Sequence, residues 1–346
     1  MTVRLAHPER SLRRGAADLE IALLNNMPDR ALRRTEGQFL SLLDAASGAR
    51  RVRLRLCSLP AIPRGADLAA HLGRFYAPLE SLAENPPDGM IITGAEPRTA
   101  DLTHEIFWPG LCDVMEFAAR RTRSCFLSCL AAHAAVLHFD AVARRRLPAK
   151  CTGIFAHEHA APHPLTAGIE GPIRLPHSRW NGLEEEALPG RGYRALLHAP
   201  AAGVGVFVKS FGSLFVFSQP HPEYGAEMPG REYRRDVRRY LDGQQPTYPD
   251  LPLGVFPSRL GARLLAFRDR ARIERDPALF AEFPALPQPS AAPWRDAAVT
   301  LFANWLDLLA PQFAASAFAS AGAAGAPANV VTPASHAFAT AGCALR

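Results

Sequence analysis

The sequence predicts an α/β protein built on a doubly wound, mostly parallel β-sheet. In the first 140 residues, short apolar runs typical of buried strands alternate with longer segments that have the apolar spacing of helices. Turn-forming residues follow several of the strand-like runs, for example Asn26 and Gly94. Strand–helix alternation of this kind is typical of parallel sheets, in which functional groups gather at the carboxyl ends of the strands.

The elements of the first half follow in order from these patterns. Apolar alternation or a short continuous apolar run predicts a strand, and apolar residues three to four apart predict a helix. Thr35 is the expected N-cap of the first helix. The predicted elements are strands at residues 19–24, 51–56, 88–94 and 124–128, and helices at residues 35–43, 102–120 and from 130 onward.

The second half is less regular and contains more proline. Residues 205–209 and 213–218 are typical of a β-hairpin, joined at Phe211 and Gly212. Helices are predicted at residues 232–240, about 260–273 and 294–309, each with apolar residues at helical spacing.

Composition divides the chain into one domain with two appendages. Residues 1–16 are polar and rich in arginine, and we expect a flexible N-terminal arm there. Residues 17–312 form the expected domain, which contains a Pro- and Arg-rich insertion at about 258–290. Residues 313–346 are Ala, Ser, Gly and Pro with few large apolar groups, which predicts a disordered tail.

The overall composition excludes several classes of protein. Hydrophobic residues make up 48% and charged residues 21% of the chain, as in globular proteins. No apolar run approaches the roughly 18 residues of a membrane span, and the N-terminus lacks the apolar region of a signal peptide, so we predict a cytoplasmic protein with no membrane contact. The net charge of +6 suits an anionic substrate, whereas the scattered arginines, without a basic-aromatic stripe, argue against nucleic acid.

The motifs in the sequence also limit which cofactors we expect the protein to bind. The six cysteines show no metal-type pairing, which predicts free thiols and no metal site. No GxGxxG and no Walker-type loop is present, so a dinucleotide or nucleotide cofactor has little support.

Cys129 lies at the junction between a predicted buried strand and an Ala-rich helix. A thiol at such a turn is exposed to a substrate, and the first amides of the helix can stabilise negative charge on it or on a developing oxyanion. Taken alone, the segment is more typical of a buried structural cysteine on a core strand.

A second segment makes a nucleophile more plausible. His221 and Glu223 lie two residues apart in an extended segment after the apolar run 214–217, so both side chains can point the same way. A cysteine nucleophile needs an imidazole to take its proton and a carboxylate to orient that imidazole. A lone His-Pro-Glu is usually a solvated loop, but together with Cys129 it indicates a Cys–His–Glu triad.

Ordered segments along residues 19–312 resemble the homoserine O-succinyltransferase and O-acetyltransferase family, which is related to the class I glutamine amidotransferases. Each segment is short, but together they follow the order of the family. The matching segments are residues 24–28 with 35–36, 91–95, Cys129, Lys150 with 153–155, 176–179, 221–224, 232–236 and 304–306. The resemblance implies a class I glutamine amidotransferase-like, flavodoxin-like fold.

The resemblance also implies a ping-pong acyl transfer from an acyl-CoA to L-homoserine, in methionine and sulfur amino-acid biosynthesis. Cys129 would carry the acyl group as a thioester, His221 would act as general base, and Glu223 would orient His221. The backbone amide of Leu130 would donate to the oxyanion. The implied partners are succinyl-CoA or acetyl-CoA and an amino-acid acceptor, with no further cofactor and a possible homodimer.

Three further residues match substrate positions of the family. Arg235 and Lys150 match positions that contact the amino-acid acceptor, and Ser178 matches a position of the substrate pocket. An arginine fork suits an α-carboxylate. Without the resemblance, Arg235 would be taken for a charge on a helix surface, and Lys150 and Ser178 would fit solvated loops equally well.

The sequence departs from the family around both substrates. After the nucleophile the family usually has Cys-Trp-Gly-Ala-Gln-Ala, whereas here Leu130 and His133 replace the tryptophan and the glutamine. Arg98 lies where a family position bears on acyl choice, and its charge suits a donor with a distal carboxylate, which predicts succinyl over acetyl. Trp180 follows the matched pocket segment, and it leaves L-serine open as an alternative acceptor because one methylene changes binding by only about 1–3 kcal/mol.

Two other classes of function stay open at this stage. The first is a class I glutamine amidotransferase-like hydrolase with the same triad, against which the absence of a Gly-x-Cys-x-Gly motif argues. The second is a non-catalytic relative that binds an amino acid or a partner. It predicts an unreactive Cys129, so selective alkylation of this thiol at neutral pH would count against it.

Overall fold

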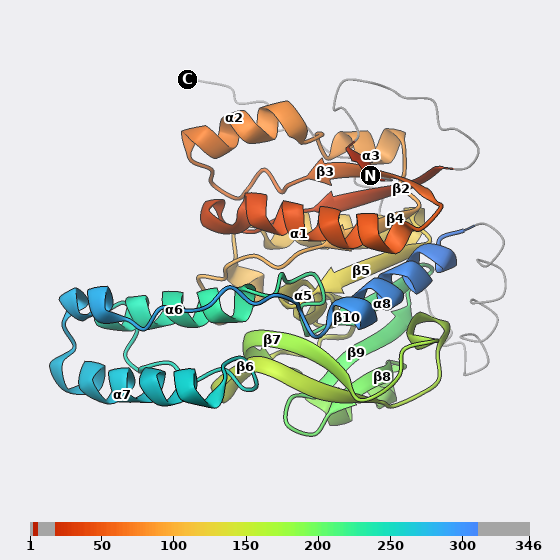
Figure 1. Ribbon diagram of the computed structural model, residues 1–346. Coiled ribbons are helices and arrows are strands. Elements are labelled where there is room, and N and C mark those ends of the chain that lie inside the picture. The colour runs from red at the N-terminus through yellow and green to blue at the C-terminus, as the bar shows by residue number, and fades with distance from the viewer. Residues whose placement is uncertain (1–2, 6–17, 311–346) are drawn as a thin grey trace, which may run out of the picture.

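The computed structural model describes residues 3–5 and 18–310, and within them one ten-stranded sheet forms the centre of the molecule (Figure 1). The strands are β1 (Val3–Leu5), β2 (Asp18–Leu24), β3 (Arg51–Cys57), β4 (Gly89–Ile92), β5 (Ser124–Ser128), β6 (Arg145–His159), β7 (Ile173–Gly182), β8 (Arg194–Ala199), β9 (Gly203–Ser210) and β10 (Leu214–Ser218). Their spatial order is β1-β3-β2-β4-β5-β10-β9-β8-β6-β7.

The first six strands of that order are parallel, and the last four continue the sheet in antiparallel fashion. Within the parallel part, β3-β2-β4-β5-β10 has the flavodoxin-like order 2-1-3-4-5. The predicted doubly wound, mostly parallel sheet is therefore confirmed. The predicted hairpin is also confirmed as β9 and β10, joined at Gly212, whose φ is +93°.

The helices connect the strands and cover both faces of the sheet. They are α1 (Asp29–Ser47), α2 (Ala66–Phe75), α3 (Glu80–Glu84), α4 (Trp108–Arg121), α5 (Leu130–Asp140), α6 (Met228–Leu241), α7 (Ser258–Glu274) and α8 (Arg295–Leu308), with short 3-10 turns at Leu102–His104, Pro164–Thr166, Glu185–Ala187, Pro189–Arg191 and Pro277–Glu282. The prediction of Thr35 as an N-cap is wrong. Pro28 holds the N-cap position of α1 with an extended backbone, and Thr35 is buried inside the helix.

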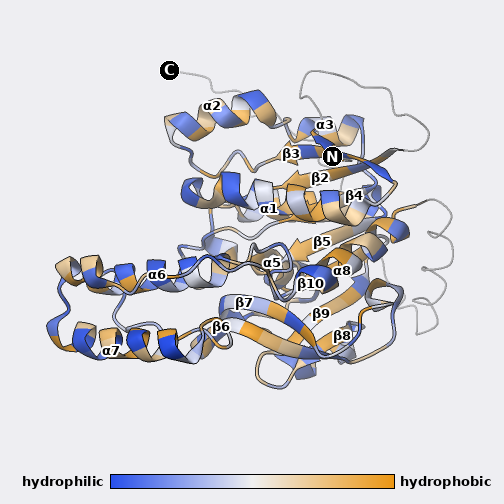
Figure 2. Cartoon of the chain, viewed as in Figure 1, coloured by the Kyte–Doolittle hydropathy of each residue, from blue (hydrophilic) through white to orange (hydrophobic). Residues whose placement is uncertain are grey.

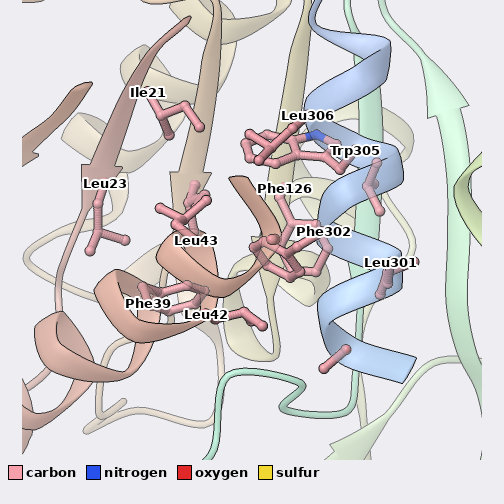
Figure 3. Packing of buried hydrophobic residues seen from close by; sticks show 14 of the residues in the cluster. Ile21, Leu23, Phe39, Leu42, Leu43, Phe126, Leu301, Phe302, Trp305 and Leu306 are labelled. Atoms are coloured by element: carbon pink, nitrogen blue, oxygen red, sulfur yellow. The ribbon is translucent and has the colours of Figure 1, made fainter. Parts of the chain in front are cut away.

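Side-chain alternation along β2 separates two hydrophobic cores. Ile21 and Leu23 point into one core with α1 and α8, whereas Ala22 and Leu24 point into the other with α4 and α5. Figure 3 shows the first core, where Phe302 of α8 lies against Phe126 of β5 with ring centroids 4.8 Å apart. Both faces of β2, β4 and β5 are buried, so these three strands appear in the sequence as nearly continuous apolar runs.

Helices α6 and α7 form a lateral extension of the molecule (Figure 1). Their apolar stripes, visible as alternating bands in Figure 2, meet in a separate core that includes Tyr233, Val237, Leu264 and Phe267. Most of the Pro- and Arg-rich insertion is thus α7 and a 3-10 turn packed on α6, rather than irregular decoration.

The structure differs from the sequence prediction at the N-terminus and in the second half. Residues 3–5, assigned to a flexible arm, form β1 and pair with β3 instead. The rest of that arm and the predicted tail at 313–346 lie outside the described residues. Strands β6, β7 and β8 were not predicted. In β6, few residues are buried and Pro148 interrupts the sequence, so this strand lacks a strand-like apolar pattern.

Candidate active site

The backbone presents Cys129 on a sharp turn between β5 and α5. Cys129 has φ 51° and ψ −106°, a conformation that is rare for a residue with a side chain. Its amide donates to the carbonyl of Ser218 at the end of β10 (2.7 Å), and its carbonyl accepts from the amides of Ala132 and His133. These bonds hold the strained turn, which is the geometry of a nucleophile elbow.

Leu130 begins α5, so its amide has no carbonyl of the helix to bond to and is available to an oxyanion beside Cys129. Gly94, which follows β4, packs directly against it. A Cβ at Gly94 would lie 3.0 Å from Cβ of Leu130 and 3.4 Å from its amide nitrogen. The predicted oxyanion donor therefore lies where two strand ends meet, and a glycine is needed for the close approach.

His221 and Glu223 form a buried hydrogen-bonded pair after β10. Nδ1 of His221 donates to Oε1 of Glu223 over 2.8 Å, and the hydroxyl of Ser128 donates to the same oxygen over 3.2 Å. The ring of Tyr224 stacks on the imidazole, with centroids 4.3 Å apart and planes 15° apart. The carboxylate thereby fixes the tautomer and leaves Nε2 of His221 to face a substrate or the thiol.

Electrostatics connect His221 to Cys129 as well. Burial of the imidazole opposes protonation, but the negative charges of Glu223 and of a Cys129 thiolate, and hydrogen bonds to both side chains, raise the pKa of His221 well above its ordinary value. The structure therefore brings the three predicted catalytic residues together as a connected chain.

Buried polar contacts hold the segment that carries His221. The backbone amide of His221 donates to the carbonyl of Pro176 in β7 (2.8 Å). Gln219, two residues earlier, lies with Oε1 2.8 Å from Nε2 of His133 and donates to the carbonyl of Val204. Burial lowers the pKa of His133 to about 4, so this histidine is a neutral packing partner rather than a proton carrier.

Lys150 and Arg235 meet on one carboxylate. Nζ of Lys150 lies 2.7 Å from Oδ2 of Asp236, and Nε of Arg235 lies 2.9 Å from Oδ1 of the same side chain. Arg235 also lies 3.4 Å from Glu232, whose carboxylate accepts from the hydroxyl of Tyr224. Burial favours the protonated form of Asp236, but the charges of Lys150 and then Arg235 outweigh it and lower its pKa.

A break in the β6–β7 pairing explains how Lys150 reaches this cluster. The register jumps between Arg146 and Cys151, so that the residues between them leave the ladder. Ser178, the third predicted substrate residue, lies half-buried in β7 opposite Thr152, two residues from the carbonyl that holds His221. Arg235 and Ser178 thus belong to elements, α6 and β7, that also contact the segment of residues 221–224.

The histidines behind Ser178 form a neutral chain. Nε of Arg179 donates to Nδ1 of His177 (3.3 Å), and Nε2 of His177 lies 3.0 Å from Nε2 of His157. Nδ1 of His157 in turn donates to the carbonyls of Phe155 and Ile173. Burial lowers the pKa of His157 to about 4 and that of His177 well below its ordinary value. Both are structural supports of β7.

Among the described residues, no hydrogen bond or ion pair joins the side chain of Arg98 to Cys129, His221 or Glu223. It is exposed on the loop after β4 and lines a cavity of about 550 Å³ with Asn26, Arg30 and Glu105. Its amide donates to Glu105, and the preceding Glu96 pairs with Arg30 and with Arg239 of α6. The predicted role of Arg98 in acyl choice stays a prediction.

Sequence reasoning missed several residues of the site. Ser128, Tyr224 and Asp236 contact its predicted members, and each adjoins a residue that had been singled out, so sequence proximity was the available signal. Arg144 lies within electrostatic reach of Cys129. Arg144 is the first of three consecutive arginines, and no pattern in the sequence singles it out.

Three further observations concern the thiols, groups that could bind a metal, and helices that could cross a membrane. Cys57, Cys112, Cys125, Cys129 and Cys151 are free thiols, as predicted, and Cys343 lies outside the described part of the chain. Within residues 3–5 and 18–310, no three His, Cys, Asp or Glu side chains are grouped to hold a metal ion. None of the helices in the same ranges is long and apolar enough to cross a membrane.

Comparison with known proteins identifies the family that this chain matches. A family model described as homoserine O-succinyltransferase matches residues 2–315. A protein of that name from Methylorubrum extorquens is 45% identical over 315 residues, covering 90% of this chain and 92% of the relative. Those from Rhodopseudomonas palustris and Bradyrhizobium japonicum are 44% and 43% identical over 88% and 86% of this chain, and over 92% of each relative.

Among solved structures, a glutamine amidotransferase from Thermotoga maritima aligns with a TM-score of 0.47 and 10% identity, over 84% of this chain and 97% of that chain. A likeness of this size does not by itself establish a common fold. The match to the family model spans all of the described residues, including every residue of the site above. This chain belongs to the homoserine O-succinyltransferase family, a family of acyltransferases.

Proposed function

We propose that this protein transfers the acyl group of an acyl-CoA, preferably succinyl-CoA, to the hydroxyl of L-homoserine through a thioester on Cys129. The observation that carries the proposal is the Cys129–His221–Glu223 chain at a strained strand–helix turn, in a member of this family. O-acylation of homoserine activates its hydroxyl as a leaving group, a step of methionine and sulfur amino-acid biosynthesis.

The first half-reaction loads the acyl group. His221 takes the proton of the Cys129 thiol, and the sulfur attacks the thioester carbonyl of the donor. The Leu130 amide stabilises the oxyanion of the tetrahedral intermediate. When the intermediate collapses, the bond to the CoA sulfur breaks, the proton passes from His221 to that sulfur, and free CoA leaves behind an acyl-Cys129 thioester.

The second half-reaction transfers the acyl group to the acceptor. His221 takes the proton of the homoserine hydroxyl, and the oxygen attacks the acyl-Cys129 carbonyl. Collapse of this second intermediate breaks the carbon–sulfur bond, and the proton held by His221 returns to the sulfur. Glu223 keeps Nδ1 of His221 protonated and stabilises the imidazolium in both half-reactions.

The cluster around Asp236 is our proposed acceptor site. Arg235 keeps 38% of its side chain exposed although two carboxylates contact it, so guanidinium N–H groups are accessible to the α-carboxylate of an amino acid. Lys150 adds a second positive charge on the other oxygen of Asp236, and half-buried Ser178 of β7 is the proposed pocket residue. L-serine, one methylene shorter, is the alternative acceptor.

Donor choice is proposed from the family and from Arg98. The matched family model and the relatives named above carry succinyl transfer in their names, which supports succinyl over acetyl. A cation at Arg98 would pair with the distal carboxylate of a succinyl group. If Arg98→Glu leaves the ratio of succinyl-CoA to acetyl-CoA turnover unchanged, this role is wrong.

The test of the proposed function is release of free CoA. Wild-type protein and Cys129→Ser are each mixed with succinyl-CoA or acetyl-CoA and with L-homoserine or L-serine. We expect acceptor-dependent release that is fastest with succinyl-CoA and homoserine and is lost in Cys129→Ser. Absence of release with every pair, from folded protein, would contradict the proposal and favour a hydrolase of the glutamine amidotransferase type.

The proposal needs acyl-CoA as co-substrate and no resident cofactor. A homodimer, a cytoplasmic location and the absence of a nucleic-acid partner stay predictions, to be checked by light scattering, cell fractionation and nucleic-acid binding.

A further inference from the structure

A second cavity lies where α5 ends, at the opposite end of the helix from Cys129. It has a volume of about 470 Å³, and its wall carries Arg144, Arg145, Arg146 and Arg191 against one carboxylate, Glu184. We call it the basic pocket. Its lining has a strong excess of positive charge, whereas the cavity that Arg98 lines is of mixed charge.

The arginines of the basic pocket are poorly neutralised. The side chain of Arg145 is 69% exposed and lies 3.9 Å from Glu184, at the limit of an ion pair. Arg146 stacks on the ring of Trp180 at 4.2 Å, an arrangement that uses the flat face of the guanidinium and leaves its N–H edge free. Arg191 donates to the uncharged carbonyl of Asp140. Neither Arg146 nor Arg191 has an ion-pair partner among the described residues.

Arg144 connects the basic pocket to the nucleophile. Its guanidinium donates to the carbonyls of Thr99 and Ala100, at 3.3 and 3.0 Å, while its Nε is buried without a hydrogen-bond partner within residues 3–5 and 18–310. The charge of a Cys129 thiolate acts on it. Helix α5 has 11 residues, so at about 1.5 Å per residue its two ends are roughly 16 Å apart.

We propose that the basic pocket binds the phosphate groups of the CoA part of the donor. This inference rests on the acyl-CoA-dependent function proposed above. A CoA thioester carries its reactive carbonyl at one end of the flexible pantetheine arm and its pyrophosphate and 3′-phosphate at the other. The protein has the matching division, with Cys129 at the start of α5 and unpaired guanidinium groups at its end. Arginine forks bind phosphate oxygens in pairs.

Binding of CoA itself tests the basic pocket without any turnover. The full chain carrying Cys129→Ser is titrated calorimetrically with CoA, alone and with Arg145→Gln and Arg191→Gln added together. Because exposed charge-assisted contacts contribute modestly, we expect the Kd to rise about tenfold in the double variant and to rise with salt in the parent. The matched control is Arg263→Gln with Arg272→Gln, two exposed arginines of α7. An unchanged Kd for CoA, or no CoA binding at all, would overturn the inference.

Steady-state kinetics then distinguish binding of the CoA phosphates from binding of the acyl group. In protein with Cys129 intact, the double variant should raise the KM for succinyl-CoA about tenfold by the same reasoning, with kcat and the KM for homoserine unchanged. The KM for succinyl-pantetheine, which lacks the phosphates, should not change. An equal rise for both thioesters would contradict phosphate binding. CoA binding by a wild-type protein that transfers no acyl group would sink the proposed function and leave the basic pocket standing.

Discussion

The negative charge of Glu223 raises the pKa of His221. Replacing it in Glu223→Gln keeps the shape but removes the charge that raises the pKa of His221. We expect kcat to fall by about 10²–10⁴, the usual contribution of a well-placed general base. The acid limb of the pH–rate profile, where His221 must lose its proton before it can act as a base, should move to lower pH.

Ser128→Ala is the matched control for Glu223→Gln. It removes one hydrogen bond of 3.2 Å to the same carboxylate oxygen without changing charge, so its effect should be about fivefold, as for a net 1 kcal/mol. Equal losses in the two variants, or an unmoved pH profile in Glu223→Gln, would mean that Glu223 only shapes the site.

The proposed role of Arg235 in acceptor binding can be separated from catalysis. Arg235→Gln should raise the KM for homoserine about tenfold or more, because a charge-assisted contact to the α-carboxylate is lost, with a smaller effect on the KM for the acyl-CoA. Arg238→Gln, on the same helix and paired with Asp242, is the control and should change neither constant. Steady-state kinetics with each substrate varied give the answer, and a rise confined to the donor KM would refute the assignment.

Among single residues, the sequence predicted the proposed catalytic chain but not its surroundings. Cys129 is far in the sequence from the pair His221 and Glu223, and chemical type with strand–turn context was enough to connect them. Arg98 matches a family position, but its side chain is exposed and lines the cavity with Asn26, Arg30 and Glu105. Arg144 could not be found, because its proximity to Cys129 depends on how the chain turns after α5, which no local pattern records.

At the scale of elements, Gly153 joins β6 to the chain that leads into α7. Its φ is +128°, and a Cβ there would lie 2.3 Å from the amide nitrogen of Leu253, whose backbone bonds to both neighbours of the glycine. Gly153→Ala should therefore lower the free energy of unfolding by at least about 1–3 kcal/mol. It should also raise the KM for homoserine, since Lys150 precedes it on the same strand.

Gly37→Ala is also a glycine-to-alanine change, but we expect it to stabilise the protein, whereas Gly153→Ala should destabilise it. Gly37 is exposed in the middle of α1, and nothing lies within 4 Å of its added Cβ. Alanine there should stabilise the protein by about 0.5–1 kcal/mol. Urea unfolding of both variants decides the matter, and a neutral Gly153→Ala would show that the junction at Leu253 is loose.

Among the elements, the buried parallel strands were predictable, and the antiparallel extension was not. Strands β2, β4 and β5 are buried on both faces, and their apolar runs are unambiguous. Helix α1 begins six residues before the predicted cap, because Leu32 is the only buried apolar residue in its first two turns and the polar sequence there resembles a loop. Strand β6 is stabilised by pairing with β7 rather than by burial, and pairing leaves little trace in a single sequence.

At the scale of the whole molecule, buried neutral histidines make stability depend on pH. The folded-state pKa values of His133 and His157 are lowered to about 4 by burial, whereas an unfolded histidine titrates near 6.5. Between these values the unfolded chain binds protons that the folded chain does not. The free energy of unfolding should thus fall as pH drops from about 6.5 to 4, by up to about 1.4 kcal/mol per pH unit for each histidine.

His133→Gln should make that pH dependence shallower, with His104→Gln, an exposed histidine, as the control that leaves it unchanged. His221 cannot explain an acid loss, because its pKa is raised and its contribution disappears as pH increases. Urea titrations at several pH values between 7 and 4 measure the slope. Parallel curves for the wild type and His133→Gln would contradict the prediction.

Intact-mass spectrometry detects directly whether Cys129 carries the acyl group during the proposed transfer. Protein mixed with succinyl-CoA without acceptor should gain one succinyl group, mapped to Cys129, which L-homoserine removes as O-succinylhomoserine. Burial raises the pKa of Cys57, Cys112, Cys125 and Cys151, so labelling should be selective. Turnover to product with no adduct on Cys129 at any time would contradict the account and indicate direct transfer.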